Sequence, residues 1–457
     1  MHTGKYRIPS HTIYEHWLDV PLDYFGALER LPEGTSTAGI GMSITIFARE
    51  YVRDGQENAP RLVFFQGGPG NAAPRMAPLG SWLDTALNYF RVVLLDERGT
   101  GNSNPLEASA ITSVGSPEVQ AAYLSCFRQD SIVQDAERMR QALQGDTKWA
   151  ALGQSFGGFC VTCYLSQAPE GLSEAFITAG LPSTHLHPDE VYRRTYAQTA
   201  VRNRQLFERY PGDEETAWYI AEHLADVEEY LPTGERLTPG RFRQLGMVLG
   251  YSYGLESLHF LLEDPIWNFH GQRRIRPQTL AKFGHALSFA DDPLYAVLHE
   301  SIYGQESVGA LGWSAQRVRG EFPEFDLPAR AAGASGEMDL RTLGEERGFS
   351  FRFTGEHIFP WQFDEDPALR GLKPAAENLE FSTHLPNLYD RDVLAENTVP
   401  TAAWIYVDDM FVPFDLSRQT ASEIRGLRPL ISNKYHHDAL RTAGPGIVED
   451  LVAAVRQ

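Results

Sequence analysis

Short apolar runs that alternate with amphipathic segments dominate residues 1–182 of the chain. Each run has the length and composition of a buried strand, and the set comprises residues 40–48, 61–65, 91–95, 149–152 and 175–179. Helical patterns lie between the runs, near residues 82–89 and at 132–143, where Asp130 and Ser131 are expected to cap the helix. Strands that alternate with helices predict βαβ units and a mostly parallel sheet.

The pattern changes in the middle of the chain. Residues 183–390 are rich in helix formers and aromatic residues, and β-branched runs are few. Strand and helix patterns return towards the end, at residues 401–407, 429–432 and 446–456. We therefore expect an α/β core built from two segments, 1–182 and 391–457, with a large helical cap domain inserted between them.

Composition and charge narrow the class of protein. Hydrophobic residues make up 42% of the 457 residues and charged residues 22%, which is typical of a globular chain rather than a disordered one. The formal net charge is −20, and an acidic chain without a Lys/Arg block is a poor candidate for binding nucleic acid. The sequence contains no apolar run of transmembrane length and no signal-peptide pattern. With three cysteines, too few for a disulfide framework, we expect a cytoplasmic protein that does not bind membranes.

The sequence Gly153-Gln-Ser155-Phe-Gly157 matches the G-x-S-x-G nucleophile elbow. In that motif the serine occupies a strained turn between a strand and a helix, and Ser155 has a predicted strand before it and a predicted helix after it. Gly250-Tyr-Ser252-Tyr-Gly254 also fits the motif, but Ser252 follows a helical pattern inside the predicted insertion. We therefore predict Ser155 as the nucleophile and Ser252 as a turn or helix-cap residue.

A nucleophilic serine needs a base and an orienting carboxylate, which in this order of elements follow the serine along the chain. Asp408 and Asp409 come directly after the strand pattern at 401–407, and we favour Asp409 because it fits the strand end. His436 and His437 lie after the last predicted strand, where the base is expected. A histidine pair can also bind metal, but no second cluster with ligand spacing accompanies it, so we predict no metal site.

A glycine-rich turn, QGGPG at residues 66–70, follows one of the buried strands. Bare backbone N–H groups in such a turn can approach a developing oxyanion because no side chain intervenes. The expected donors are the backbone amides of Gly68 and Phe156. Cys160 and Cys163 lie on the helix after Ser155 and are expected to pack in the core.

Five segments together resemble the prolyl aminopeptidase (proline iminopeptidase) family, and they occur in the family's order: RLVFFQGGPG, VVLLDERGTGNS, ALGQSFGGF, VDDMFVP and YHHDALR. These are serine peptidases of the α/β-hydrolase fold, and the larger bacterial form with a long helical cap is the more similar. Two positions depart from the pattern: many members have His in place of Gln66 and Gln in place of Glu97. Neither position donates a catalytic side chain in the family.

The resemblance implies a function and a set of site residues. Ser155 would be the nucleophile, Asp409 the acid and His437 the base. Glu356 and Glu256 lie in segments that match those whose glutamates bind the substrate's amino terminus. The implied substrates are small peptides with a free N-terminal proline, and the implied reaction needs no metal or organic cofactor.

Two other functions remain open at this stage. One is an esterase, or an aminopeptidase of different specificity, on the same α/β-hydrolase core, because specificity resides in the insertion. The other is a non-catalytic binding protein of the same fold. The sequence leaves the oligomeric state open.

Overall fold

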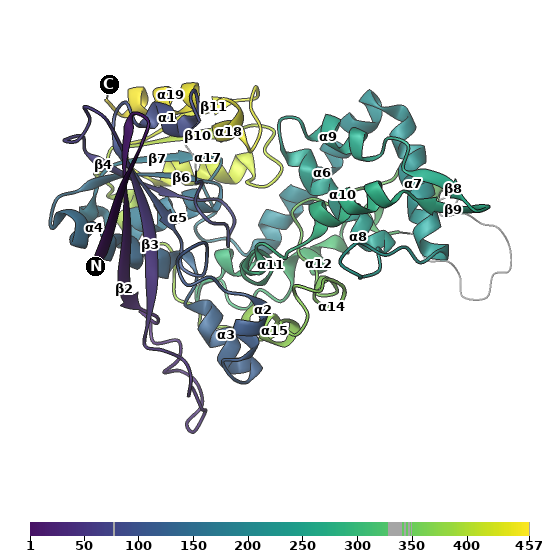
Figure 1. The fold of residues 1–457 in the computed structure, drawn as a ribbon, viewed down its shortest axis with the longest axis horizontal. Helices are drawn as coiled ribbons and strands as arrows, with labels where there is room; N and C mark the ends of the chain where they lie inside the picture. The colour runs from purple at the N-terminus through teal and green to yellow at the C-terminus, as the bar shows by residue number, and fades with distance from the viewer. Residues whose placement is uncertain (76–77, 328–340, 342–343, 346–347, 349, 457) are drawn as a thin grey trace. The chain divides into compact units, whose positions relative to one another are not determined.

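The computed structural model describes residues 1–75, 78–327, 341, 344–345, 348 and 350–456. They form two compact units (Figure 1). The first unit comprises Met1–Val191, Asp292–Gly312 and Gly371–Gln457, and the second comprises Tyr192–Asp291 and Trp313–Arg370.

The predicted insertion at residues 183–390 contains the whole second unit and also three segments that belong to the first, at residues 183–191, 292–312 and 371–390. Residues Asp292–Gly312 group with the first unit because their side chains pack closely on its glycine-rich turns. A Cβ atom on Gly70 would lie 2.8 Å from the Tyr295 backbone nitrogen, and one on Gly99 would lie 2.7 Å from a methyl carbon of Leu294. A single inserted domain with the predicted boundaries therefore stays a prediction.

The described residues of the first unit form a nine-stranded sheet with the strand order β1-β2-β3-β5-β4-β6-β7-β10-β11. The strands are β1 (His2–Ile8), β2 (His11–Pro21), β3 (Ser43–Arg53), β4 (Arg61–Phe65), β5 (Arg91–Asp96), β6 (Trp149–Gln154), β7 (Leu172–Thr178), β10 (Thr401–Tyr406) and β11 (Leu427–Ser432). The first three pair antiparallel, and all pairs from β5 to β11 are parallel. The carboxyl ends of the parallel strands therefore meet at one edge of the sheet, where ligand and catalytic groups gather in open α/β folds.

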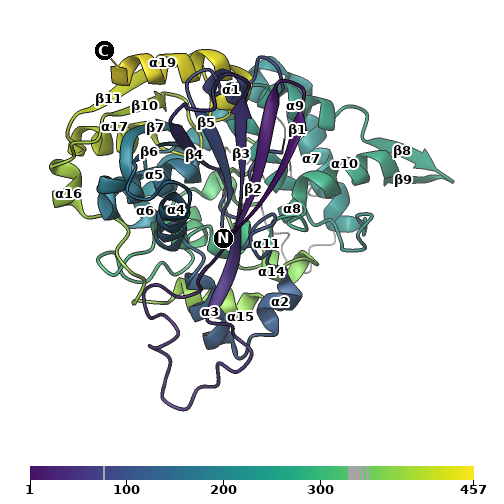
Figure 2. The ribbon, with the colours of Figure 1, turned by 60° about the vertical axis from the view of Figure 1, so that its left-hand side comes forward.

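Helices cover both faces of this sheet (Figures 1 and 2). The described helices of the first unit are α1 (Trp82–Ala86), α2 (Ala108–Thr112), α3 (Pro117–Ser125), α4 (Gln129–Gln144), α5 (Phe156–Gln167), α11 (Pro293–Leu298), α15 (Lys373–Glu380), α16 (Arg391–Ala395), α17 (Phe414–Glu423), α18 (Ala439–Thr442) and α19 (Gly444–Arg456), with short 3₁₀ turns η1 (Pro169–Gly171) and η3 (Ser301–Tyr303). Among them, α5 and α19 each contact several strands of the sheet, whereas α3 packs with α15. Alternate strand residues such as Leu62 and Phe64 pack with Trp82 of α1 and Leu451 of α19. The other face of β4 lies against α5, where the Phe65 ring meets the Tyr164 ring edge to face.

The second unit is mainly helical. Its elements are α6 (Pro188–Arg209), α7 (Pro211–Asp226), α8 (Pro239–Arg243), α9 (Gly254–Leu261), α10 (Pro277–Leu287), α12 (Ser314–Arg319) and α14 (Gln362–Glu365), the 3₁₀ segments η2 (Gln244–Gly250) and η4 (Pro323–Phe325), and the hairpin β8 (Ile266–Phe269) with β9 (Gln272–Ile275). Nowhere in the described chain is a helix both long enough and apolar enough to cross a bilayer. The helical character agrees with the sequence pattern, whereas the hairpin was not predicted.

One strand was not predicted, and the start of one helix needs correction. Strand β1 pairs with β2 at the edge of the sheet, and its mostly exposed residues lack the apolar pattern of a buried strand. The helix expected after Asp130 and Ser131 begins earlier, at Gln129, and its N-cap residue is Arg128. Both expected caps are buried inside the first turn instead, and α4 packs against α5.

The turn after β5 is held by a buried ion pair. Arg98 is 1% exposed and binds both carboxylate oxygens of Asp135 on α4 at 2.7 Å. The same guanidinium donates to the carbonyls of Leu22 and Cys126 at 2.7 and 2.5 Å. These contacts tie the turn after β5 to α4, to the end of α3 and to the residue that follows β2.

We expect Arg98→Met to lower the free energy of unfolding by about 3–5 kcal/mol, because it leaves the buried Asp135 carboxylate without its cation. Urea unfolding of wild type and variant measures the loss. Arg7→Met is the matched control, because Arg7 forms an exposed ion pair with Asp54 at 2.8 Å, and it should change stability by less than about 1 kcal/mol. Equal small losses for both variants would contradict the buried network.

Candidate active site

Ser155 lies where the sequence motif places it, between the end of β6 and the start of α5. Its φ is 56° and its ψ is −125°, a strained combination for a residue with a side chain. The Ser155 N–H donates to the carbonyl of Thr178, at the end of β7, over 3.1 Å. The strand end and the helix start thus hold Ser155 in the sharp turn of a nucleophile elbow.

Two glycines of the motif are required by close packing. A Cβ atom on Gly153 would lie 2.1 Å from the Gly157 carbonyl oxygen, and one on Gly157 would lie 2.0 Å from the Phe65 carbonyl oxygen. Both distances are far below van der Waals contact, and both neighbours are backbone. Any larger residue at either position would push α5 away from β4 and β6, and would displace Ser155.

The structure brings Ser155, His437 and Asp409 into one chain of hydrogen bonds. The Ser155 hydroxyl lies 2.8 Å from His437 Nε2, and His437 Nδ1 lies 2.9 and 3.1 Å from the two carboxylate oxygens of Asp409. His437 and Asp409 are each 4% exposed. With Asp409 as the acceptor, Nδ1 carries the proton, so Nε2 is free to accept the hydroxyl proton of Ser155.

Backbone amides orient the carboxylate of Asp409. Asp409 follows β10, and its Oδ1 accepts hydrogen bonds from the N–H groups of Phe411 and Val412 at 2.9 and 3.0 Å. This Asx-type turn explains why the second acid of the Asp408-Asp409 pair points at the imidazole. His437 comes from the segment after β11, so all three residues belong to the first unit.

Two contacts to His437 were missed by sequence reasoning. The Phe411 ring meets the imidazole edge to face, with ring centroids 4.7 Å apart. The Gln154 side-chain amide donates to the His437 carbonyl at 3.3 Å. Gln154 occupies the first variable position of the G-x-S-x-G motif, and nothing in the motif indicates which residue type that position needs.

The turn at residues 66–70 runs directly beside Ser155. A Cβ atom on Gly67 would lie 3.0 Å from the Ser155 Cβ and 2.6 Å from Gln154 Oε1. The amides of Gly68 and Phe156 do not donate to the described backbone carbonyls outside helices and strands. Gly68 lies next to Gly67 in this turn, and Phe156 follows Ser155 in the chain, so both predicted oxyanion donors lie in segments next to Ser155.

Asp96, at the end of β5, binds the segment that follows the turn at residues 66–70. Its Oδ1 accepts from the Ala73 N–H at 3.1 Å, and its Oδ2 accepts from the Asn102 N–H at 2.8 Å. Arg75 donates to both oxygens at 2.7 Å. The carboxylate therefore connects the loop after β4 to the loop after β5, which the sequence showed only as two glycine-rich turns.

Comparison with known proteins agrees with this geometry. A family model described as the alpha/beta hydrolase fold matches residues 60–286. The chain is 40% identical to the proline iminopeptidase of Aeromonas sobria over 96% of this chain and 95% of the relative. The chain belongs to the proline iminopeptidase family. It is also 34% identical to the proline iminopeptidase aneH of Aspergillus aculeatus, over 86% of this chain and 84% of the relative.

Among solved structures, esterase E22 is 10% identical, with a TM-score of 0.44 over 97% of this chain and 100% of that chain. A likeness of this size adds nothing to the topology described above. The family assignment rests on the sequence relatives, and the α/β-hydrolase fold rests on the family model together with the order of the parallel strands. This family and this fold are the ones that the sequence motifs predicted.

The two glutamates that the family resemblance indicates lie in the second unit, in different surroundings. Glu256, in the first turn of α9, forms an ion pair with Arg209 of α6. Glu356 is half-buried in a run of buried residues. The neighbouring His357 stacks on Tyr196 with ring centroids 3.9 Å apart, and its Nδ1 accepts from the Gly355 N–H at 3.2 Å. The segment around Glu356 is therefore held firmly, and the charge of Glu256 is balanced by Arg209.

Ser252 precedes α9 and follows the 3₁₀ segment η2, so it lacks the strand that a nucleophile elbow needs. The three cysteines are buried free thiols, and Cys160 and Cys163 are 0% exposed on α5, as expected for core packing. Within the described ranges, no group of three or more His, Cys, Asp and Glu side chains is placed to hold a metal ion.

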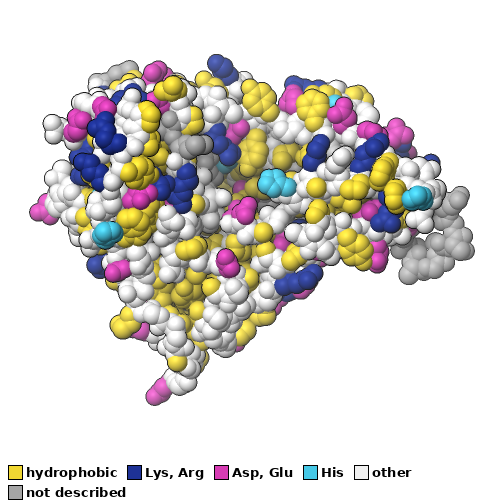
Figure 3. All heavy atoms as spheres, in the orientation of Figure 1, with side chains coloured by type: hydrophobic (Ala, Val, Ile, Leu, Met, Phe, Trp, Pro, Cys, Tyr) yellow, Lys and Arg dark blue, Asp and Glu magenta, His cyan; other side chains and the backbone are white. Residues whose placement is uncertain are grey.

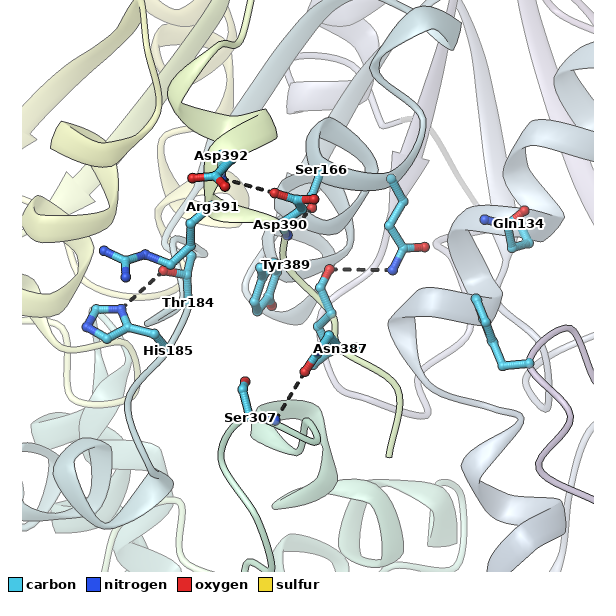
Figure 4. Close-up of a pocket in the computed structure, with 13 residues that line it drawn as sticks. Gln134, Ser166, Thr184, His185, Ser307, Asn387, Tyr389, Asp390, Arg391 and Asp392 are labelled. Carbon is cyan, nitrogen blue, oxygen red and sulfur yellow. Dashed lines mark hydrogen bonds between the residues drawn. The ribbon is translucent and has the colours of Figure 1, made fainter. Parts of the chain in front are cut away.

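A polar pocket lies in the first unit at the C-terminal end of α5 (Figure 4). Its lining includes Ser166 and Gln167, about 18 Å along the helix from Ser155 at 1.5 Å per residue. Asn387 accepts from the Ser307 N–H at 3.2 Å across one side. None of the lining residues belongs to the Ser155–His437–Asp409 chain, so this pocket is separate from the candidate active site.

Proposed function

We propose that this chain is a serine aminopeptidase that releases N-terminal proline from small peptides through an acyl-enzyme intermediate. The observation that carries the proposal is the hydrogen-bond chain from Ser155 through His437 to Asp409. The relatives named proline iminopeptidase support the choice of substrate class. The exposed charges support a small-molecule substrate over nucleic acid, because basic and acidic side chains are interspersed on the face seen in Figure 3.

The chemistry follows from the positions of these atoms. His437 Nε2 accepts the hydroxyl proton while Ser155 Oγ attacks the carbonyl carbon of the N-terminal residue. The amides of Gly68 and Phe156 donate to the resulting oxyanion. His437 then gives the proton to the leaving amine, and a water molecule, activated by the same nitrogen, releases proline and regenerates Ser155.

A panel of aminoacyl p-nitroanilides tests the substrate class. The proposal predicts a much higher kcat/KM for prolyl p-nitroanilide than for the alanyl compound or for a small neutral ester. A preference for the ester would indicate an esterase on the same core, and a preference for alanyl substrates would indicate an aminopeptidase of other specificity. No turnover of any compound would favour the non-catalytic binding protein.

We propose further that Glu356 binds the cationic amino terminus of the substrate, with Glu256 as the second candidate. A half-buried carboxylate pairs with a free amino terminus and is left unpaired by a blocked one, so it selects for exopeptidase cleavage. The rigid aromatic surroundings of Glu356 support the first choice. The ion pair with Arg209 makes Glu256 the weaker choice.

We expect Glu356→Gln to lower kcat/KM for prolyl p-nitroanilide by about 10- to 100-fold, the size of one charge-assisted contact. Hydrolysis of a small neutral ester should change little, because the ester has no cation to bind. The measurement is the ratio of the rate on prolyl p-nitroanilide to the rate on the ester. This ratio is compared between wild type, Glu356→Gln and the matched variant Glu256→Gln. An unchanged ratio in both variants would place the binding carboxylate elsewhere.

We also propose that the protein works in the cytoplasm. All three cysteines are buried free thiols, which is compatible with a reducing compartment. Fractionation of cells that produce the chain would test the location, and recovery outside the cytoplasm would overturn it.

A further inference from the structure

Glu97 is a buried acid that the proposed chemistry does not use. It follows β5 in the turn between Asp96 and Arg98, and it is 1% exposed. Both neighbours have charged partners, because Asp96 pairs with Arg75 and Arg98 with Asp135. Within the described part of the chain, neither carboxyl oxygen of Glu97 has a hydrogen-bond partner of good geometry. An acid buried without a partner is costly to keep and so calls for a physical reason.

The carboxyl group of Glu97 lies close to the backbone of the turn at residues 66–70. The backbone amide of Gln66, the first residue of the turn at 66–70, is beside it and favours its charged form. On α5, the thiol of Cys160 is close enough for its charge to interact with that of Glu97. Glu97 therefore lies between the base of the oxyanion turn and the first turns of the helix that begins after Ser155.

These surroundings favour the neutral form of Glu97. Burial raises the pKa of its carboxyl group well above the ordinary value, the Gln66 amide offsets this only in part, and the nearby Asp96 carboxylate raises the pKa further. Burial also raises the pKa of the Cys160 thiol, so that group adds no charge. A neutral carboxylic acid can both donate and accept a hydrogen bond, like a glutamine amide.

We propose that Glu97 is a positioning residue whose buried carboxyl group packs against the turn at residues 66–70 and so holds the backbone of that turn beside Ser155. The inference rests on the proposed function, because it takes Ser155 as the nucleophile and this turn as the oxyanion site. An ionised Glu97 would place a negative charge next to the turn that carries a proposed oxyanion donor, and would oppose the reaction. The neutral form supports the turn without that penalty.

Two variants of Glu97 distinguish the effect of its side-chain packing from the effect of its charge. E97Q keeps the shape and the neutral polar group, so its kcat should stay close to that of wild type. E97A removes the support, and its kcat should fall about 10- to 100-fold with little change in KM, because the oxyanion donors act on the transition state. Both are assayed on prolyl p-nitroanilide and on a small neutral ester. Wild-type kcat in E97A, or an E97Q variant as slow as E97A, would overturn the proposal.

Assays on the ester distinguish a failure of the proposed substrate class from a failure of the proposed role of Glu97. If wild type cleaves the ester but not the prolyl compound, the proposed substrate class fails while the effect of Glu97 can still be measured. If E97A has wild-type kcat on both compounds, the role of Glu97 fails while the proposed function stands.

The pH dependence of stability tests the neutral form even if E97A does not fold. The folded chain binds the Glu97 proton more tightly than the unfolded chain, so wild-type stability falls as pH rises from the ordinary glutamate range towards the raised pKa. E97Q lacks this loss, and should gain stability relative to wild type as pH rises above the ordinary glutamate pKa of about 4.3. The exposed Glu57, whose pKa is lowered by the Gly55 amide, serves as control, since E57Q should show no such gain. Parallel pH curves for wild type and E97Q would overturn the neutral assignment.

Discussion

Replacing Ser155 with alanine is expected to lower turnover of prolyl p-nitroanilide by on the order of 10⁴-fold or more, while the fold stays intact. Alanine removes only the Oγ atom that lies 2.8 Å from His437 Nε2. The backbone of residue 155 remains held by its N–H bond to Thr178. Initial rates, together with urea unfolding of the same preparation, separate lost chemistry from lost structure.

The partner histidine provides the matched comparison. His437→Ala should reduce turnover by a similar factor, and the double variant should be no slower than either single one, because the two residues act as a unit. His436→Ala should be much milder, since His437 makes both hydrogen bonds of the chain. An inactive His436→Ala variant together with an active His437→Ala variant would show that the base is assigned to the wrong histidine.

Asp409→Asn is expected to lower turnover by roughly 10⁴-fold. The carboxylate of Asp409 accepts the Nδ1 proton of His437, and the amides of Phe411 and Val412 fix its orientation. An asparagine held by the same amides turns its NH₂ group towards Nδ1, which then must accept. The proton moves to Nε2, and the imidazole can no longer take the proton of Ser155. Steady-state rates over a range of pH measure the effect.

Asp408→Asn is the control for this variant, because it changes the same kind of group one residue away. Asp408 is half-buried at the end of β10, whereas Asp409 is 4% exposed and contacts the imidazole. Its turnover should stay near that of wild type. A slow Asp408→Asn variant with a normal Asp409→Asn variant would move the acid to Asp408.

The parallel part of the fold was predictable because its buried strands are compact apolar runs, and three of them, β4, β5 and β6, end in glycine-rich turns. Such runs depend on local composition alone, and β4, β5 and β6 begin at the predicted residues. The edge strand β1 and the hairpin of β8 and β9 escaped prediction because their residues are largely exposed. An exposed strand is stabilised by its backbone partner, which leaves little trace in the hydrophobic pattern.

The position of the nucleophile was predictable because close backbone packing at the turn around Ser155 allows only glycine at two positions. Gly153 and Gly157 permit contacts that no side chain could, so the motif marks Ser155. Contacts between distant segments left no such signal: Gln154 donates to His437 across the sheet edge, and Arg209 neutralises Glu256 between two helices. These pairings depend on how the elements pack, and a linear pattern contains no information about that.

Titration with a fluorophosphonate tests most directly the claim that Ser155 is the nucleophile that releases proline, because the reagent modifies the serine oxygen and the loss of activity can be measured in the same sample. The loss of proline release from an unblocked prolyl peptide should track the labelled fraction of protein in direct proportion. Peptide mapping should find the label on Ser155 alone, and Ser155→Ala should take up none. Proline release that persists in fully labelled protein, or a label on Ser252, would contradict the account.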